Sequence, residues 1–309
     1  MKLMSTVLLI FICLVQNSGY AQTASELRAH VAYFASDALE GRDTASVGLA
    51  KAQTYVLAKC AEYGIETTTQ PLITSRGPCK NVIAYRVGTD PAKVLILGAH
   101  LDHVGRNFRG IYNGADDNAS GSAVLLGLAK RFSAGPKPAA TLVFQWYTGE
   151  ELGMEGSTYY ATHPLFPTDK PSLDTHFFML NLDMVGHLGR AEAATGDDID
   201  LPSILDSLYE KYPFAKGITL REGGGSDHAP FMRRGVPTVF LHTGLHRHYH
   251  QPSDDTDTLN YPGMVLVSHY AYDLVAKLAG KSDDAYVIWA ALPNYVAPEL
   301  KHGVVRNEP

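Results

Sequence analysis

Five acidic and histidine residues spread along this chain have the side chains that metal ions bind in hydrolytic sites. Each lies in a short polar motif, and most of these motifs follow an apolar run. Imidazole and carboxylate groups are ligands that a borderline ion such as zinc accepts. The sequence therefore predicts a two-metal hydrolytic site. Its candidate ligands are His100, Asp116, Glu151, Asp183 and His250.

The motif GAHLDH places His100 and Asp102 two residues apart. In an extended segment, side chains at this spacing point to the same side. His100 could bind an ion while the Asp102 carboxylate accepts the other imidazole proton, which would fix the tautomer of the ring. A surface His–Asp pair would have the same sequence.

The motif NGADDNASG is typical of a turn that leads into a helix. Asn118 or Ser120 could cap that helix, but capping does not require two adjacent aspartates. A carboxylate has two oxygens and can bridge two ions. We predict that Asp116 has this role.

The motif TGEELG places two glutamates after an apolar strand. One could bind an ion while its neighbour acts as a base on a water molecule, whose pKa zinc lowers to about 7. The base must lie within hydrogen-bonding reach of that water without binding the ion. A solvated acidic turn is the alternative interpretation.

Asp183 ends an apolar strand, where a carboxylate is costly unless it is paired or binds an ion. His187 follows and is a second candidate ligand. The glycine-rich segment GGGSDHAPF lacks the GK[ST] of a phosphate-binding loop. It also lacks the G-x-S-x-G elbow of a serine hydrolase, so Ser226 is not predicted to be a nucleophile.

The tract HRHYHQPSDD contains His246, His248 and His250. Such a tract can bind metal by composition alone, and the spacing does not choose among the three histidines. The Tyr249 hydroxyl could donate a hydrogen bond to an oxyanion. Alternatively, Tyr249 is a half-buried loop residue.

Apolar runs and helical periodicity alternate along the chain, which predicts an α/β fold. We expect a mostly parallel sheet with helices on both faces, whose ligands bind beyond the carboxyl ends of the strands. Residues 71–79 are predicted to form a loop. Strands are predicted at Asn81–Val87, Val94–Leu97, Thr141–Tyr147, Phe177–Leu182 and Thr238–His242. Helices are predicted at Ala24–Leu39, Val47–Tyr63, Gly121–Phe132, Ser157–His163, Ser203–Tyr212, His228–Arg234 and Met264–Leu278.

The first residues resemble a secretory signal peptide. Lys2 precedes the apolar stretch Val7–Val15, and the small-residue site Gly19–Ala21 follows. We therefore predict a leader over residues 1–21, a secreted or periplasmic location, and one catalytic domain over residues 22–309. A buried N-terminal helix is the alternative, because the apolar run is too short to span a bilayer.

Composition narrows the possible partners. Of the 309 residues, 45% are hydrophobic and 19% are charged, as in a globular protein. The net charge of −6 argues against a phosphate-binding surface, and therefore against nucleic acid as a partner. Cys60 and Cys79 could form a disulfide in an oxidising compartment, worth about 3 kcal/mol, or remain free thiols. Both alternatives stay open.

Together these motifs resemble those of the co-catalytic di-zinc aminopeptidases, a family that also contains glutamate carboxypeptidases and glutaminyl cyclases. The motifs AHLDH, NGADDNASG, TGEELG, NLDMVGH, SDHAPF and YHQPSDD occur in family order. The resemblance spans roughly Ala24 to Leu278. The protease-associated insertion of larger family members is absent from this span. It implies a three-layer zinc-exopeptidase fold, two zinc ions per chain, and a peptide substrate with a free N-terminus. No membrane partner is expected once the leader is removed.

The resemblance also implies the ligand sets. His100 and Asp183 would hold one zinc ion, Glu151 and His250 would hold the other, and Asp116 would bridge them. It selects His250 within the histidine-rich tract because the family's ligand precedes an x-P-x-D turn.

Further roles follow from the same resemblance. Glu150 would be the general base, Asp102 would orient the first ligand histidine, and Tyr249 would stabilise the tetrahedral oxyanion. His228 would lie near the substrate. The peptide bond from Asp116 to the next residue would be cis.

Three rival functions remain. A glutaminyl cyclase would use one zinc ion and would not need the first ligand histidine. A carboxypeptidase or dipeptidase would need a cation for the substrate carboxylate, such as Arg221, Arg233 or Arg247. A non-catalytic metal-binding domain would not need a base.

Overall fold

The computed structural model describes residues 22–188, 208, 211–212 and 225–280. The predicted leader, most of the predicted helix Ser203–Tyr212, and the segment after residue 280 lie outside these ranges. Within them, no helix has the length and apolar character needed to cross a membrane.

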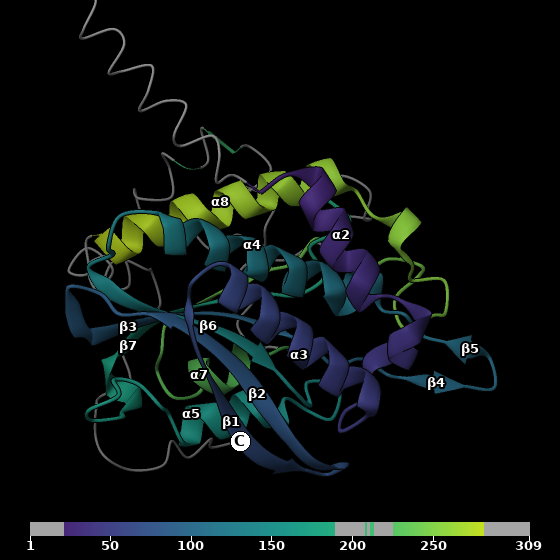
Figure 1. Cartoon of the computed structure of the whole chain (residues 1–309), viewed down its shortest axis with the longest axis horizontal. Helices are drawn as coiled ribbons and strands as arrows, with labels where there is room; N and C mark the ends of the chain where they lie inside the picture. Colours follow the sequence, from purple (N-terminus) through teal and green to yellow (C-terminus); the bar gives the residue numbers. More distant parts are fainter. Residues whose placement is uncertain (1–21, 189–207, 209–210, 213–224, 281–309) are drawn as a thin grey trace, which may run out of the picture.

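A six-stranded sheet forms the centre of the molecule (Figure 1), in the order β1-β2-β6-β3-β7-β8. The four strands β6, β3, β7 and β8 run parallel, and β2 pairs antiparallel with both β1 and β6. This confirms the predicted α/β class. The strands are β1 (Glu66–Thr74), β2 (Gly77–Arg86), β3 (Asp90–His100), β6 (Ala140–Tyr147), β7 (His176–Leu182) and β8 (Thr238–Leu241).

The predicted loop at residues 71–79 is wrong, because this segment ends β1 and begins β2. β1 has a polar sequence and is half exposed, so it lacks the apolar signal of the inner strands. Its threonines favour an extended backbone, and Pro71 is tolerated because β1 lies at the edge of the sheet. A short hairpin, β4 (Arg106–Asn107) with β5 (Gly110–Ile111), was also not predicted.

Helices cover both faces of the sheet (Figure 1). One face carries α2, α3, α4 and α8, and the other carries α5 and α7. Short helical turns η1, η2, η3 and η5 lie between them. The bounds are α2 (Ala24–Phe34), η1 (Asp37–Arg42), α3 (Val47–Glu62), η2 (Ala115–Ser120), α4 (Gly121–Ala134), α5 (Glu155–Thr162), η3 (Leu173–Thr175), α7 (Ala229–Met232), η5 (Thr256–Thr258) and α8 (Tyr261–Gly280).

Strand β3 shows why the inner strands are continuously apolar. Leu95 and Leu97 pack into the larger core beneath α4 and α8, whereas Val94 and Ile96 pack into the smaller core on the α5 side. Successive side chains of a strand point to opposite faces. A strand that is buried on both faces therefore favours apolar residues at successive positions.

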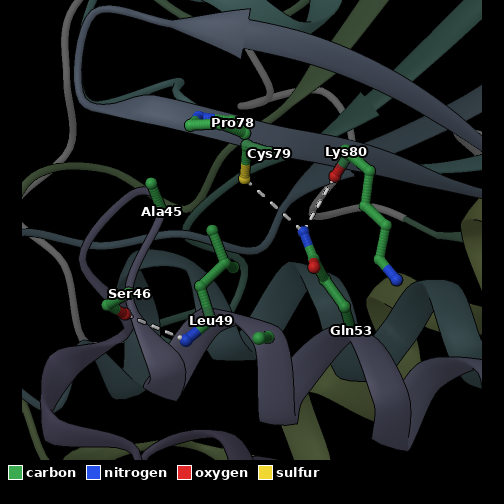
Figure 2. A pocket seen from close by; sticks show the side chains of 8 residues that line it. Ala45, Ser46, Leu49, Gln53, Pro78, Cys79 and Lys80 are labelled. Atoms are coloured by element: carbon green, nitrogen blue, oxygen red, sulfur yellow. Dashed lines mark hydrogen bonds between the residues drawn. The ribbon is translucent and has the colours of Figure 1, made fainter.

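Cys60 and Cys79 are free thiols, which decides between the two alternatives left open by the sequence. Cys60 is fully buried in α3, and burial raises the pKa of its thiol to about 12. Cys79 is half-buried in β2, with its sulfur 2.8 Å from Thr148 Oγ1. It lines a hollow of about 250 Å³ between α3 and β2, beside Gln53 (Figure 2).

We expect a thiol reagent to label Cys79 in the native protein and to leave Cys60 unmodified. The thiolate is the reactive form, and burial disfavours it at Cys60 while also blocking access. Peptide mass spectrometry after timed alkylation measures both sites, and denaturant should make them react alike. Equal labelling rates in the native protein would contradict this expectation.

Candidate metal centre

The candidate ligands converge at the carboxyl ends of the parallel strands. His100 is the last residue of β3, Glu151 follows β6, and Asp183 directly follows β7. Because parallel strands end at the same edge of a sheet, residues distant in sequence meet there. His250 arrives from the loop after β8, and the turn η2 supplies aspartates from between β3 and α4.

Asp117 lies at the centre of this arrangement. Its Oδ1 atom is 3.3 Å from His100 Nε2, which in turn is 3.2 Å from Asp183 Oδ1. Its Oδ2 atom is 3.0 Å from His250 Nε2, which is 3.2 Å from Glu151 Oε2. Each oxygen of one carboxylate therefore faces a different group of candidate ligands.

Asp116 does not lie between the two groups, which corrects our choice of bridging residue. Its carboxylate accepts a hydrogen bond from the Gly186 N–H at 2.6 Å and lies 3.0 Å from His246 Nε2. The predicted cis bond is wrong by one residue, since it joins Asp117 to Asn118. Adjacent side chains of the η2 turn point in different directions, and the sequence of two identical aspartates does not reveal which faces the site.

The two groups around Asp117 have donor spacings close to those of a zinc site. Two ligands, each about 2.0–2.2 Å from a tetrahedral ion, lie roughly 3.3–3.6 Å apart. The nitrogen–oxygen distances of 3.0–3.3 Å around Asp117 are close to this spacing. All these side chains except His250 are largely buried, so each group is a preformed, nearly dry set of donors.

A third cluster, of Asp116, His187 and His246, has donor atoms within 4.8 Å of one another. The rings of His187 and His246 stack, with centroids 3.9 Å apart and planes 17° from parallel. Ring nitrogens bind ions in the plane of the ring, so two stacked rings do not point at one ion. We therefore assign no ion to this cluster. The candidate ligand His187 belongs to it and to neither of the groups around Asp117.

Asp102 has a different contact from the one predicted. Its carboxylate is 3.9 Å from His100 Nδ1, whereas its backbone carbonyl oxygen is only 3.1 Å away. The carboxylate instead accepts hydrogen bonds from Thr44 Oγ1 at 2.8 Å and from the Glu150 N–H at 3.2 Å. Asp102 thus orients His100 through its main chain and holds the backbone of Glu150 through its side chain.

Glu150 belongs to none of the three clusters. Burial, together with nearby Asp227, Asp183 and Asp102, raises the pKa of its carboxyl to about 10. Glu150 therefore lies close enough to interact with Asp183 and His100 without belonging to a ligand cluster.

Tyr249 lies in the loop after β8, and His228 packs against Phe240 of β8. Tyr249 is 39% exposed, and its ring stacks on His250 at a centroid distance of 4.0 Å. His228 stacks on Phe240 at 4.5 Å, and burial lowers the pKa of its imidazole to about 4. His228 is therefore a neutral ring at neutral pH.

The sequence and the fold of this chain are similar to those of known peptidases. A profile described as peptidase family M28 matches residues 81–289, which is more than half of the chain. The chain belongs to peptidase family M28. This confirms the predicted family resemblance.

Relatives of this M28 chain carry related names. It is 35% identical over 191 residues to "leupeptin-inactivating enzyme 1" of Streptomyces exfoliatus, covering 62% of this chain and 42% of that protein. It is 31% identical over 199 residues to a "probable leucine aminopeptidase" of Arthroderma otae, and the match covers 59% of this chain and 54% of that protein. The chain thus spans about half the length of the curated relatives it matches.

Solved structures share the M28 fold at low sequence identity. A zinc aminopeptidase from Bacillus subtilis superposes with a TM-score of 0.71 at 15% identity, covering 85% of this chain and 97% of that one. A glutaminyl cyclase from Porphyromonas gingivalis superposes with a TM-score of 0.66 at 18% identity, covering 83% of this chain and 99% of that one. Because an aminopeptidase and a cyclase have this same fold, the fold does not choose between the two activities.

Three residues that support this M28 site were not identified from the sequence. The Asp254 carboxylate accepts the backbone N–H of Asp116 at 3.0 Å and of Asp117 at 3.1 Å. Since Asp254 lies four residues after His250, it ties the loop of that histidine to the η2 turn. The x-P-x-D turn of the sequence ends at this aspartate and was the available signal for it.

Arg42 is the second such residue, and its guanidinium is fully buried. It donates to the carbonyl oxygens of Leu101 at 3.0 Å, Asn113 at 2.7 Å and Gly114 at 3.0 Å. It therefore joins the end of β3 to the segment entering η2. The third residue is His103, the second histidine of AHLDH, whose ring faces Asp117 and Glu151.

Proposed function

We propose that this M28 chain is a zinc-dependent aminopeptidase that removes N-terminal residues from peptides. The observation that carries the proposal is the Asp117 carboxylate, whose two oxygens face two separate groups of ligands. One zinc ion would be held by His100, Asp183 and Asp117. The second would be held by Glu151, His250 and the other oxygen of Asp117.

The chain's own residues then have distinct roles in hydrolysis. Bound zinc ions would polarise the scissile carbonyl, lower the pKa of a water molecule to about 7 and favour the ionised Glu150. Glu150 would accept a proton from the attacking water and deliver it to the leaving amine. The Tyr249 hydroxyl would donate a hydrogen bond to the oxyanion, and neutral His228 would contact the substrate.

The cations of the described residues favour an aminopeptidase over a carboxypeptidase. Among these residues Arg42 is the only buried arginine or lysine, so no buried and unoccupied cation is available for a substrate carboxylate. Of the arginines considered for a carboxypeptidase, Arg233 and Arg247 are exposed, and Arg221 lies outside the described residues. The buried Arg42 is occupied by main-chain carbonyls.

A glutaminyl cyclase is the second candidate, because a cyclase shares the fold. A single-zinc cyclase would not require His100, yet His100 is buried and within 3.3 Å of both Asp117 and Asp183. The complete group of His100, Asp117 and Asp183 favours the two-ion peptidase. We further propose that the protein acts outside the cytoplasm, on the basis of its leader-like first residues.

Zinc content and substrate preference, measured on one preparation, test this function. We expect about two zinc ions per chain and cleavage of a leucyl chromogenic amide, with no cleavage of its N-acetyl form. Cleavage of both forms would favour a carboxypeptidase or an endopeptidase. One zinc ion, together with ring closure of an N-terminal glutaminyl peptide, would favour the cyclase.

A further inference from the structure

A second histidine faces the same two carboxylates as His250. The Nδ1 atom of His103 is 2.8 Å from Glu151 Oε1 and 3.6 Å from Asp117 Oδ2. His250 Nε2 is 3.2 Å from Glu151 Oε2 and 3.0 Å from Asp117 Oδ2. Four donor atoms from these residues lie within 4.8 Å of one another.

The two imidazole rings have an orientation that allows a shared ion. Their planes meet at 67° and their centroids are 5.6 Å apart, an edge-to-face arrangement. This differs from the stacked pair His187–His246, whose planes are nearly parallel. The planes of two inclined rings intersect. An ion on this line of intersection lies in the plane of both imidazoles, so both rings can bind it.

His103 is a buried histidine with few polar contacts. The side chain is fully buried, and its Nε2 atom has no hydrogen-bond partner among the described residues. Its Nδ1 atom lies against the two carboxylates, and its ring lies edge-to-face against the ring of His250. Burying an imidazole in this place is costly unless it binds something.

We infer that His103 is a metal ligand, which gives one ion site four protein ligands: His103, Asp117, Glu151 and His250. This inference rests on the proposed two-zinc function. The other site has three protein ligands, His100, Asp117 and Asp183. Four protein ligands close a tetrahedral zinc site, whereas three leave a position for water or substrate.

The two sites are therefore unequal. The four-ligand site binds the first zinc ion and holds it more tightly, and the three-ligand site loads second and keeps the open position. A histidine that only donated a hydrogen bond to Glu151 would also strengthen binding, by about 10–100-fold. Affinity alone does not separate these two roles, so the ligands themselves must be counted.

X-ray absorption spectroscopy of protein loaded with one zinc ion per chain counts the imidazoles bound to that ion. We expect two imidazoles in the wild type, from His103 and His250, and one in His103→Asn. Chelator competition should show that the tighter zinc affinity falls more than 100-fold in His103→Asn, with little change in the weaker one. The matched control His248→Asn alters a histidine of the same loop as His250. Its ring hydrogen-bonds to Ser253 and Arg247, lies beside the rings of His187 and His246, and belongs to none of the three clusters. This control should leave both measurements unchanged.

One imidazole in the singly loaded wild type would overturn the inference, as would unchanged spectra in His103→Asn. If His103→Asn does not fold, the wild-type spectrum alone decides. Two zinc ions per chain with one imidazole each would refute the role of His103 and leave the proposed function intact. Fewer than two ions in the fully loaded wild type would refute the two-zinc function itself, whatever the imidazole count.

Discussion

Replacing Glu150 by glutamine is expected to reduce peptidase turnover by roughly 10²–10⁴-fold while leaving zinc content unchanged. General acid–base catalysis contributes about this factor, and glutamine preserves the shape of the side chain but cannot accept the proton. Glu150 is in none of the ligand groups, so its loss should not release an ion. Steady-state kcat and the number of zinc ions per chain, measured on the same preparation, check both parts.

The neighbouring residue provides a matched contrast. Glu151→Gln changes the same chemical group one position along the chain, but Glu151 lies 3.2 Å from His250 Nε2. We expect this variant to bind the corresponding zinc ion much more weakly. Near-wild-type turnover in Glu150→Gln with both ions present would contradict the assignment of the base, and loss of zinc would instead make Glu150 a ligand.

The fold was predictable wherever burial left a clear pattern. The mainly apolar runs of β3, β6 and β7 are buried on both faces, and the sequence predicts all three. β1 was missed because an edge strand that is half exposed needs few apolar residues. Its pairing with β2 is decided by tertiary contact, which local sequence patterns do not record.

The candidate site was predictable by motif but not by individual atom. Motifs at strand ends indicated which segments meet, since parallel strands place their carboxyl ends together. The direction of each side chain depends on turn geometry that the sequence does not encode in a simple period. That is why Asp116 was chosen over Asp117 and why His103 was overlooked, although both lie within motifs that the sequence identified.

The two adjacent aspartates provide the sharpest test of the corrected site. We expect Asp117→Asn to lower the zinc content from about two ions per chain to one or fewer and to abolish peptidase activity. An amide has a single acceptor oxygen and no charge, so it cannot bridge two cations. We expect Asp116→Asn to retain both ions, because this carboxylate contacts Gly186 and His246 instead.

Asp116→Asn should still be costly to the fold. The buried carboxylate accepts a charge-assisted bond from His246 Nε2, and the loss of such a contact costs about 1–3 kcal/mol. A lower melting temperature with two retained zinc ions would therefore separate the two aspartates by role. If Asp116→Asn loses an ion and Asp117→Asn keeps both, the bridging carboxylate is Asp116, and the geometry of the η2 turn described above is wrong.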